Sequence, residues 1–137
     1  MAETARRRPS RHLDDQRIAR AIEEAQAAST GRIVVAVAPH FWGDVRRAAE
    51  RAFRHHRMHE TADRNGVYIF VVPSRRTFVV LGDAAIHQRV GQSYWDTLRD
   101  ATAERIKSND LTDGIVHAIE DVGRQLAAHF PRRQSES

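Results

Sequence analysis

The sequence predicts an α/β protein, a three-layer α/β/α sandwich around a mixed, mainly parallel sheet that includes one antiparallel hairpin. Two apolar runs, residues 67–72 and 77–81, are separated by the short link 73–76, which is typical of a hairpin. The first run is apolar at every position, so helices must cover both of its faces. A strand, a helix and a second strand precede the hairpin turn, and this order predicts a right-handed parallel unit.

The first helix begins at a capping residue, either Asp14 or Asp15. Its apolar residues recur at helical spacing: Ile18, Ala21, Ile22 and Ala25. We expect Thr30 and Gly31 to end it, with Gly31 in the left-handed conformation that is common at helix ends. Residues 32–38 are then typical of a strand, which Pro39 ends.

Asp44 is placed to cap the second helix, and Phe41 and Trp42 are expected to pack the start of that helix onto the sheet. The alternative for Trp42 is an exposed aromatic contact. Two further helices follow the hairpin. Their buried faces are expected to consist of Trp95, Leu98, Thr102 and Ile106 in one helix, and Leu111, Ile115, Ile119, Val122, Leu126 and Phe130 in the other.

The length of 137 residues suits one domain, which we expect over residues 13–131. Residues 1–12 and 132–137 have few apolar groups and predict a disordered basic arm and a disordered tail. The sequence has no cysteine, so disulfides, thiolate metal sites and cysteine nucleophiles are excluded. Neither a signal peptide nor an apolar run long enough to span a bilayer is found, and we expect a soluble, cytoplasmic protein.

The two ends of the chain account for its basic character. They carry six arginines and two glutamates, which together equal the formal net charge of +4. The arginine-rich arm favours weak, salt-sensitive attraction to anions at most, and we expect no specific nucleic-acid partner. A protein partner is left open.

A polar cluster is predicted at one end of the hairpin, because the fold-back brings Asp83 beside the residues that open the preceding strand. Asp63, Asn65 and Asp83, with Asp96 as a fourth member, offer the oxygen ligands that calcium or magnesium prefers. The alternative is structural: Asp63 and Asn65 organise a turn, and Asp83 caps a short helix or pairs with Arg64 or Arg32.

The histidines offer a weaker metal pattern. His55 and His59 are four residues apart near Glu60, as zinc ligands on one helix would be, but flanking arginines and an expected helix end favour surface histidines. His40 and His87 are expected to be turn or packing residues. No serine has a recognisable base and orienting acid, so no nucleophile stands out.

Taken together, several short motifs resemble the TPM domain family over about residues 14–131. The matching pieces are residues 30–35, 64–69, 82–83 with 86–87, 90–91, 94–96, 113–114 and 129–131. The closest resemblance is to the small stand-alone bacterial branch.

The resemblance implies an α/β/α sandwich and two classes of function. Some family members are acid phosphatases, and some bind calcium or other divalent ions. The family usually has glutamate where this chain has Arg32, which should weaken cation binding nearby. We therefore expect a binding or accessory module with a divalent-ion or polar-ligand site, in which Arg64 and Arg32 contact the ligand. The alternative is a divalent-metal-assisted acid phosphatase.

Overall fold

The computed structural model describes residues 13–132, which form five α-helices and three strands. In chain order these are α2 (Asp15–Ala27), β1 (Arg32–Val37), α3 (Val45–His55), β2 (Gly66–Val72), β3 (Thr77–Gly82), α4 (Ala84–Val90), α5 (Gln92–Ser108) and α6 (Leu111–His129). Two 3-10 turns flank β2, η1 (Met58–Glu60) before it and η2 (Pro73–Arg75) after it. The predictions for the arm and the tail lie outside the described residues, apart from Arg132, which donates hydrogen bonds to the carbonyls of Gln26 and Ala27.

The sheet has the order β1-β2-β3, with one parallel and one antiparallel pairing. β1 runs parallel to β2, so that Val34 lies opposite Tyr68. β3 runs antiparallel to β2, so that Val80 lies opposite Ile69. This is the mixed sheet with one hairpin that the sequence predicts. The central strand β2 is buried along its whole length, because each of its faces is covered by helices.

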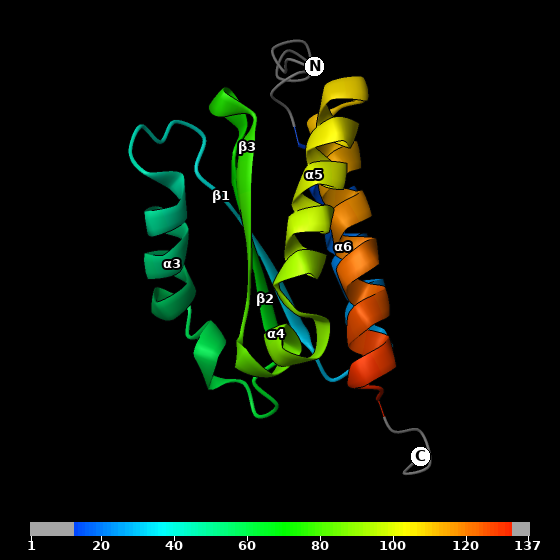
Figure 1. Cartoon of the computed structure of the whole chain (residues 1–137). Helices are drawn as coiled ribbons and strands as arrows, with labels where there is room; N and C mark the ends of the chain where they lie inside the picture. Colours follow the sequence, from blue (N-terminus) through cyan, green and yellow to red (C-terminus); the bar gives the residue numbers. More distant parts are fainter. Residues whose placement is uncertain (1–12, 133–137) are drawn as a thin grey trace.

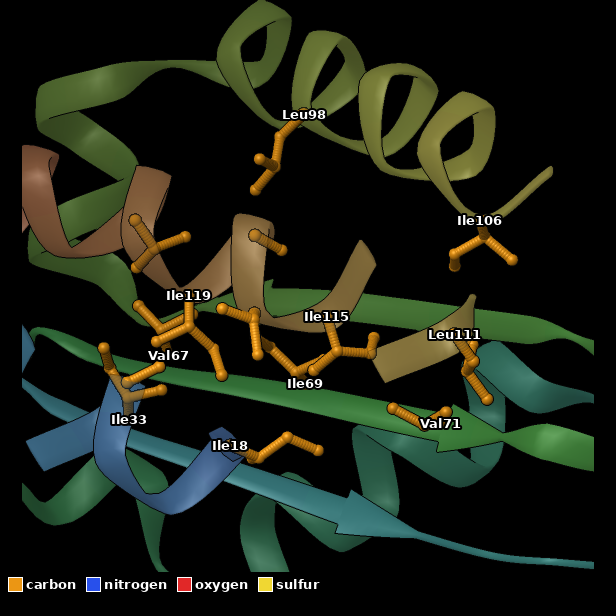
Figure 2. Close-up of a cluster of buried hydrophobic side chains, with 14 of the residues drawn as sticks. Ile18, Ile33, Val67, Ile69, Val71, Leu98, Ile106, Leu111, Ile115 and Ile119 are labelled. Atoms are coloured by element: carbon orange, nitrogen blue, oxygen red, sulfur yellow. The ribbon is translucent and has the colours of Figure 1, made fainter. Parts of the chain in front are cut away.

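Because helices cover both faces of the sheet, the protein has three layers (Figure 1). α3 covers one face of the sheet and packs against β2 and β3, whereas α2, α5 and α6 lie over the other face. Figure 2 shows the larger core, where Ile33 of β1 and Val67, Ile69 and Val71 of β2 meet side chains of the three helices. The opposite side chains of β2, including Tyr68, meet α3 and η1 in a second core. The predicted α/β/α sandwich is therefore confirmed.

The capping prediction for Asp14 is confirmed, but the role predicted for Gly31 is wrong. α2 ends at Ala27, and Gly31 has no positive φ. A Cβ atom at Gly31 would lie 2.8 Å from both Cδ atoms of Leu126, so this glycine allows the chain just before β1 to approach α6 closely. The same reason applies to Gly82, where a Cβ would lie 2.4 Å from Cζ2 of Trp95.

The two aromatic residues of the loop before α3, Phe41 and Trp42, have different environments. Phe41 packs edge-on against Phe70, with ring centroids 6.3 Å apart, as the sequence predicts. Trp42 does not pack on the sheet: it is 88% exposed. Asp44 caps α3 by accepting a hydrogen bond from the Arg47 backbone N–H at 3.0 Å.

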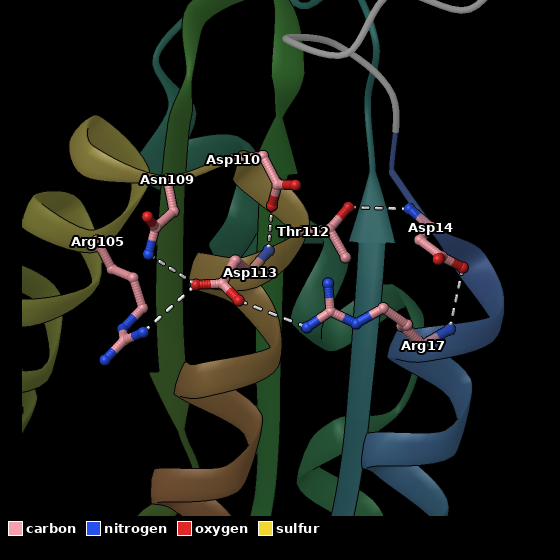
Figure 3. A network of polar contacts seen from close by, with 7 residues as sticks. All are labelled: Asp14, Arg17, Arg105, Asn109, Asp110, Thr112 and Asp113. Carbon is pink, nitrogen blue, oxygen red and sulfur yellow. Dashed lines mark hydrogen bonds and ion pairs between the residues drawn. The ribbon is translucent and has the colours of Figure 1, made fainter.

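A polar network around Asp113 joins the three helices of the larger layer (Figure 3). The Asp113 carboxylate accepts hydrogen bonds from Arg17 of α2 at 3.5 Å and from Arg105 of α5 at 3.3 Å. Asn109, which follows α5, donates a third at 3.0 Å, and Asp110 caps α6 through the Asp113 N–H. Partial burial acts to raise the pKa of the Asp113 carboxyl, but the three donors outweigh it and lower the pKa.

We expect Gly82→Ala to lower the free energy of unfolding by about 1–3 kcal/mol, because the added methyl group overlaps the Trp95 ring. Chemical denaturation monitored by far-UV circular dichroism measures this loss. In the double variant Gly82→Ala/Trp95→Phe the smaller ring leaves room for the added methyl group. The free energy of unfolding should therefore fall by less than the sum of the decreases in the two single variants. Strictly additive costs would contradict the proposed contact.

We expect Asp113→Asn to lower the free energy of unfolding by about 1 kcal/mol at pH 7. Because the Asp113 pKa is lower in the folded state, the ionised carboxylate stabilises the fold at every pH above the pKa of the unfolded state. This stabilisation is lost as the pH falls through the pKa of the folded state. The gap between wild type and variant should therefore close as the pH falls to about 2. Asp100→Asn, at an exposed carboxylate, is the matched control, and an equal loss there would count against the network.

Candidate functional site

The start of β2 and the end of β3 meet at one edge of the sheet, which we call the rim (residues 63–66 and 82–85). The Asp83 N–H donates a hydrogen bond to the Gly66 carbonyl, and the Ala85 N–H donates one to the Arg64 carbonyl, each at 2.9 Å. These bonds continue the antiparallel pairing of Val67 with Gly82. The hairpin thus brings the two chain segments together as its sequence pattern predicts.

Arg64 holds the Asp83 carboxylate with two hydrogen bonds at the rim. Arg64 Nε lies 2.7 Å from Oδ2 of Asp83, and a terminal guanidinium nitrogen lies 3.0 Å from Oδ1. Asp83 is 6% exposed, whereas the Arg64 side chain is half exposed and its backbone has a φ of 51°. The hydrogen bond and the negative charge of Asp83 raise the pKa of the Arg64 guanidinium. Asp83 occupies the N-cap position of α4, but its side chain makes no cap hydrogen bond.

Asn65 belongs to a second group at the rim, with Asp63 and Thr30. The buried Asn65 amide donates a hydrogen bond to Thr30 Oγ1 at 3.1 Å, and Thr30 Oγ1 donates one to Asp63 Oδ2 at 2.6 Å. Asn65 Oδ1 is buried and has no hydrogen-bond partner in the described part of the chain. Thr30 is not among the site residues that the sequence predicts. Its position just before β1 was the available signal, because parallel strands begin at the same edge of a sheet.

Two of the predicted site residues have no such contacts with the rim. Asp96 lies on α5, where its carboxylate accepts a hydrogen bond from Gln92 at 3.0 Å and pairs with Arg99 at 3.5 Å. Arg32 begins β1 opposite Gly66, and its exposed side chain forms no hydrogen bond or ion pair with another described residue. Within residues 13–132, no three histidine, aspartate or glutamate side chains are grouped to share a metal ion.

A hollow of about 320 Å³ opens beside Asp83, between α3, η1 and the end of β3. It has apolar and charged walls, lined by Glu50, Phe53, Arg54, His59, Leu81, Gly82 and Asp83. His59 Nδ1 is buried without a hydrogen-bond partner, and its Nε2 lies 3.6 Å from Oε2 of Glu60. The hollow therefore places the Glu50 carboxylate, the Arg54 guanidinium and the His59 imidazole around Asp83.

Among the described residues, the other histidine patterns do not form a metal site, and two of these histidines have structural contacts. α3 ends at His55, and Arg57 has a positive φ of 57°, so His55 and His59 do not share a helix face. His56 Nδ1 hydrogen-bonds the Tyr68 hydroxyl at 2.8 Å, and burial raises the pKa of that tyrosine. His87 Nδ1 accepts a hydrogen bond from the Trp95 indole at 2.9 Å, which is the packing role that the sequence predicts.

None of the helices within residues 13–132 is long and apolar enough to cross a bilayer.

Comparison with known proteins shows the family. The family model described as the TPM domain matches residues 12–125. The chain is similar to the solution structure of the BA42 protein from the psychrophilic bacterium Bizionia argentinensis, with 32% identity and a TM-score of 0.80, over 91% of this chain and 88% of that chain. The N-terminal domain of the cg2496 protein from Corynebacterium glutamicum shares the fold, with 17% identity and a TM-score of 0.64, over 86% of this chain and 74% of that chain. No curated protein matches the chain. Because the family model covers most of the sequence, the chain belongs to the TPM domain family.

Proposed function

We propose that the protein is a cytoplasmic binding or accessory module that holds a polar ligand at the rim, beside Asp83. The observation that carries this proposal is a buried carboxylate that opens onto a hollow while a half-exposed arginine neutralises it. A carboxylate of this kind could be satisfied by the fold alone. Here the hollow beside it also contains the Arg54 guanidinium and His59 Nδ1, neither of which has a hydrogen-bond partner among the described residues, and this favours a ligand.

The sharper form of the proposal is a divalent cation, calcium or magnesium. Asp63, Asn65 and Asp83 would supply its oxygen ligands, and the partnerless Asn65 Oδ1 is an atom that a cation would satisfy. Both oxygens of Asp83 are engaged by Arg64, so the cation requires the guanidinium to move away. Its half-exposed side chain can turn into solvent without opening the core. Arg64 would then contact an anion that accompanies the cation.

A phosphatase is the second candidate, and the composition of the hollow supports it. Arg54 lines the hollow and could bind phosphoryl oxygens, and His59 Nδ1, which has no partner among the described residues, is the candidate proton donor or acceptor. Arg64 lies outside the hollow and would reach a phosphoryl group only from the other side of Asp83. A divalent ion, when bound, would polarise the phosphoryl group.

Titration with calcium or magnesium, followed by amide chemical shifts, tests the cation site. We expect the changes to cluster at residues 63–66 and 82–85. Asp83→Asn should weaken binding about tenfold or more, since a charged oxygen ligand is lost. Asp100→Asn removes the same charge from an exposed position of α5 and should leave the affinity unchanged. Equal affinities of wild type and Asp83→Asn would refute the site.

The direction in which Arg64→Gln changes the binding affinity distinguishes a cation from an anionic ligand. Arg64→Gln frees the Asp83 carboxylate and should tighten calcium binding, whereas an anion held by the guanidinium would bind more weakly. Arg32→Glu should also tighten calcium binding, because it replaces a positive charge at the neighbouring strand end. Thermal melting of each variant shows whether the fold persists, since Arg64→Gln leaves Asp83 without its partner.

Hydrolysis of p-nitrophenyl phosphate with and without magnesium tests the phosphatase. Turnover that depends on magnesium and is lost in both Asp83→Ala and His59→Gln would favour the enzyme over the binding module. The matched control is His55→Gln, at an exposed histidine outside the hollow. Turnover that survives both changes at the hollow would exclude this site as its source.

A further inference from the structure

The outer face of α3 carries a stripe of arginines that have no partner within residues 13–132. Arg47, Arg51 and Arg54 are spaced by four and then three residues, so they lie on one side of the helix over about 10 Å. All three are exposed, and their guanidinium groups form no ion pair or hydrogen bond with another residue of the described part of the chain. This contrasts with Arg17 and Arg105, which share the Asp113 carboxylate.

The nearest acidic residues do not neutralise the stripe. Glu50 lies on the same helix but pairs with Arg46, at 3.9 Å. Asp44 caps the first turn through the Arg47 backbone N–H rather than through its guanidinium. Because Glu50 is already paired with Arg46, the outer face of α3 keeps a net positive charge, which attracts polyanions.

An indole projects from the loop at the start of this helix. Phe41 is packed against Phe70, and a Cβ at Gly43 would lie 3.0 Å from the Phe41 ring, so this part of the loop is tightly packed. A guanidinium nitrogen of Arg75 donates hydrogen bonds to the carbonyls of Phe41 and Gly43, at 3.2 and 2.8 Å. These contacts fix the loop on both sides of Trp42 and leave its indole 88% exposed.

The fold leaves this surface accessible along its whole length. α3 lies by itself on its side of the sheet, whereas α2, α5 and α6 lie on the opposite side (Figure 1). A single helix on the outside of a layered protein is convex, and a convex basic face suits a flat anionic surface.

We propose that α3 and Trp42 form a docking surface for bilayers that contain anionic phospholipids. The guanidinium groups bind headgroup phosphates, and the indole lies at the headgroup level, where tryptophan is favoured. A nucleic acid fits less well, because single strands are bound by several stacked aromatic rings in a basic groove. Here one indole accompanies arginines on a convex helix. Of the stripe, Arg54 also lines the hollow beside Asp83, whereas Arg47, Arg51 and Trp42 do not. Docking through these three residues therefore does not depend on the proposed rim ligand.

Co-sedimentation with phosphatidylcholine vesicles that contain about 30 mol % phosphatidylglycerol tests the proposal. We expect binding at about 50 mM NaCl that is lost at about 500 mM NaCl, and none to pure phosphatidylcholine. The variant Arg47→Ala/Arg51→Ala should bind about tenfold more weakly. It leaves Arg54, which also lines the rim hollow, in place. The control Arg20→Ala/Arg99→Ala removes the same charge from α2 and α5 and should bind within about twofold of wild type.

Trp42 provides a second readout. Its fluorescence should shift to shorter wavelengths when vesicles are added, and Trp42→Phe should abolish the shift, because the other tryptophan, Trp95, is buried. Asp83→Asn should bind vesicles like the wild type, which keeps this test distinct from that of the rim. The proposal is overturned if both arginine double variants bind equally, or if pure phosphatidylcholine binds as well as the anionic vesicles. Preferential binding to duplex DNA that is lost in Arg47→Ala/Arg51→Ala would assign the surface to nucleic acid instead.

Discussion

Burial of β2 on both faces is the constraint on which the rest of the structure depends. All seven residues of this strand are buried. Burying a valine or isoleucine side chain completely stabilises the folded state by about 1.5–3 kcal/mol relative to leaving it exposed. A strand of this kind requires cover on two sides, so the chain must supply helices before and after the hairpin. α3 meets Tyr68, Phe70 and Val72, while α2, α5 and α6 meet Val67, Ile69 and Val71.

The pairing of β2 with its neighbours also determines where the polar side chains of the rim come together. Its pairing with β1 and β3 brings the starts of two strands and the end of a third to one edge, where backbone hydrogen bonds end and loop residues must satisfy one another. Arg64 with Asp83, and Asn65 with Thr30 and Asp63, are the results. A rim built in this way places buried polar atoms beside a hollow.

Arginines have two distinct roles in this protein. Some hold the fold together: Arg64 closes the rim, Arg75 fixes the loop before α3, and Arg105 joins α5 to α6. Others, on the outer face of α3, remain without partners among the described residues. The amino-acid composition does not distinguish paired arginines from unpaired ones. The sequence between the two basic ends has no net charge, and this value gives no indication of the arginine stripe on α3.

The sequence by itself determined the layers, the hairpin, a helix cap at Asp14 or Asp15, the cap at Asp44, and the nearness of Asp83 to the start of β2. These follow from local periodicity, capping chemistry and strand pairing. Only the tertiary structure decided which partner each side chain takes: that Arg64 rather than a helix cap binds Asp83, that Gly31 makes room for Leu126, and that Trp42 is exposed. Such choices depend on atoms from segments far apart in the chain, whose distances no local pattern encodes.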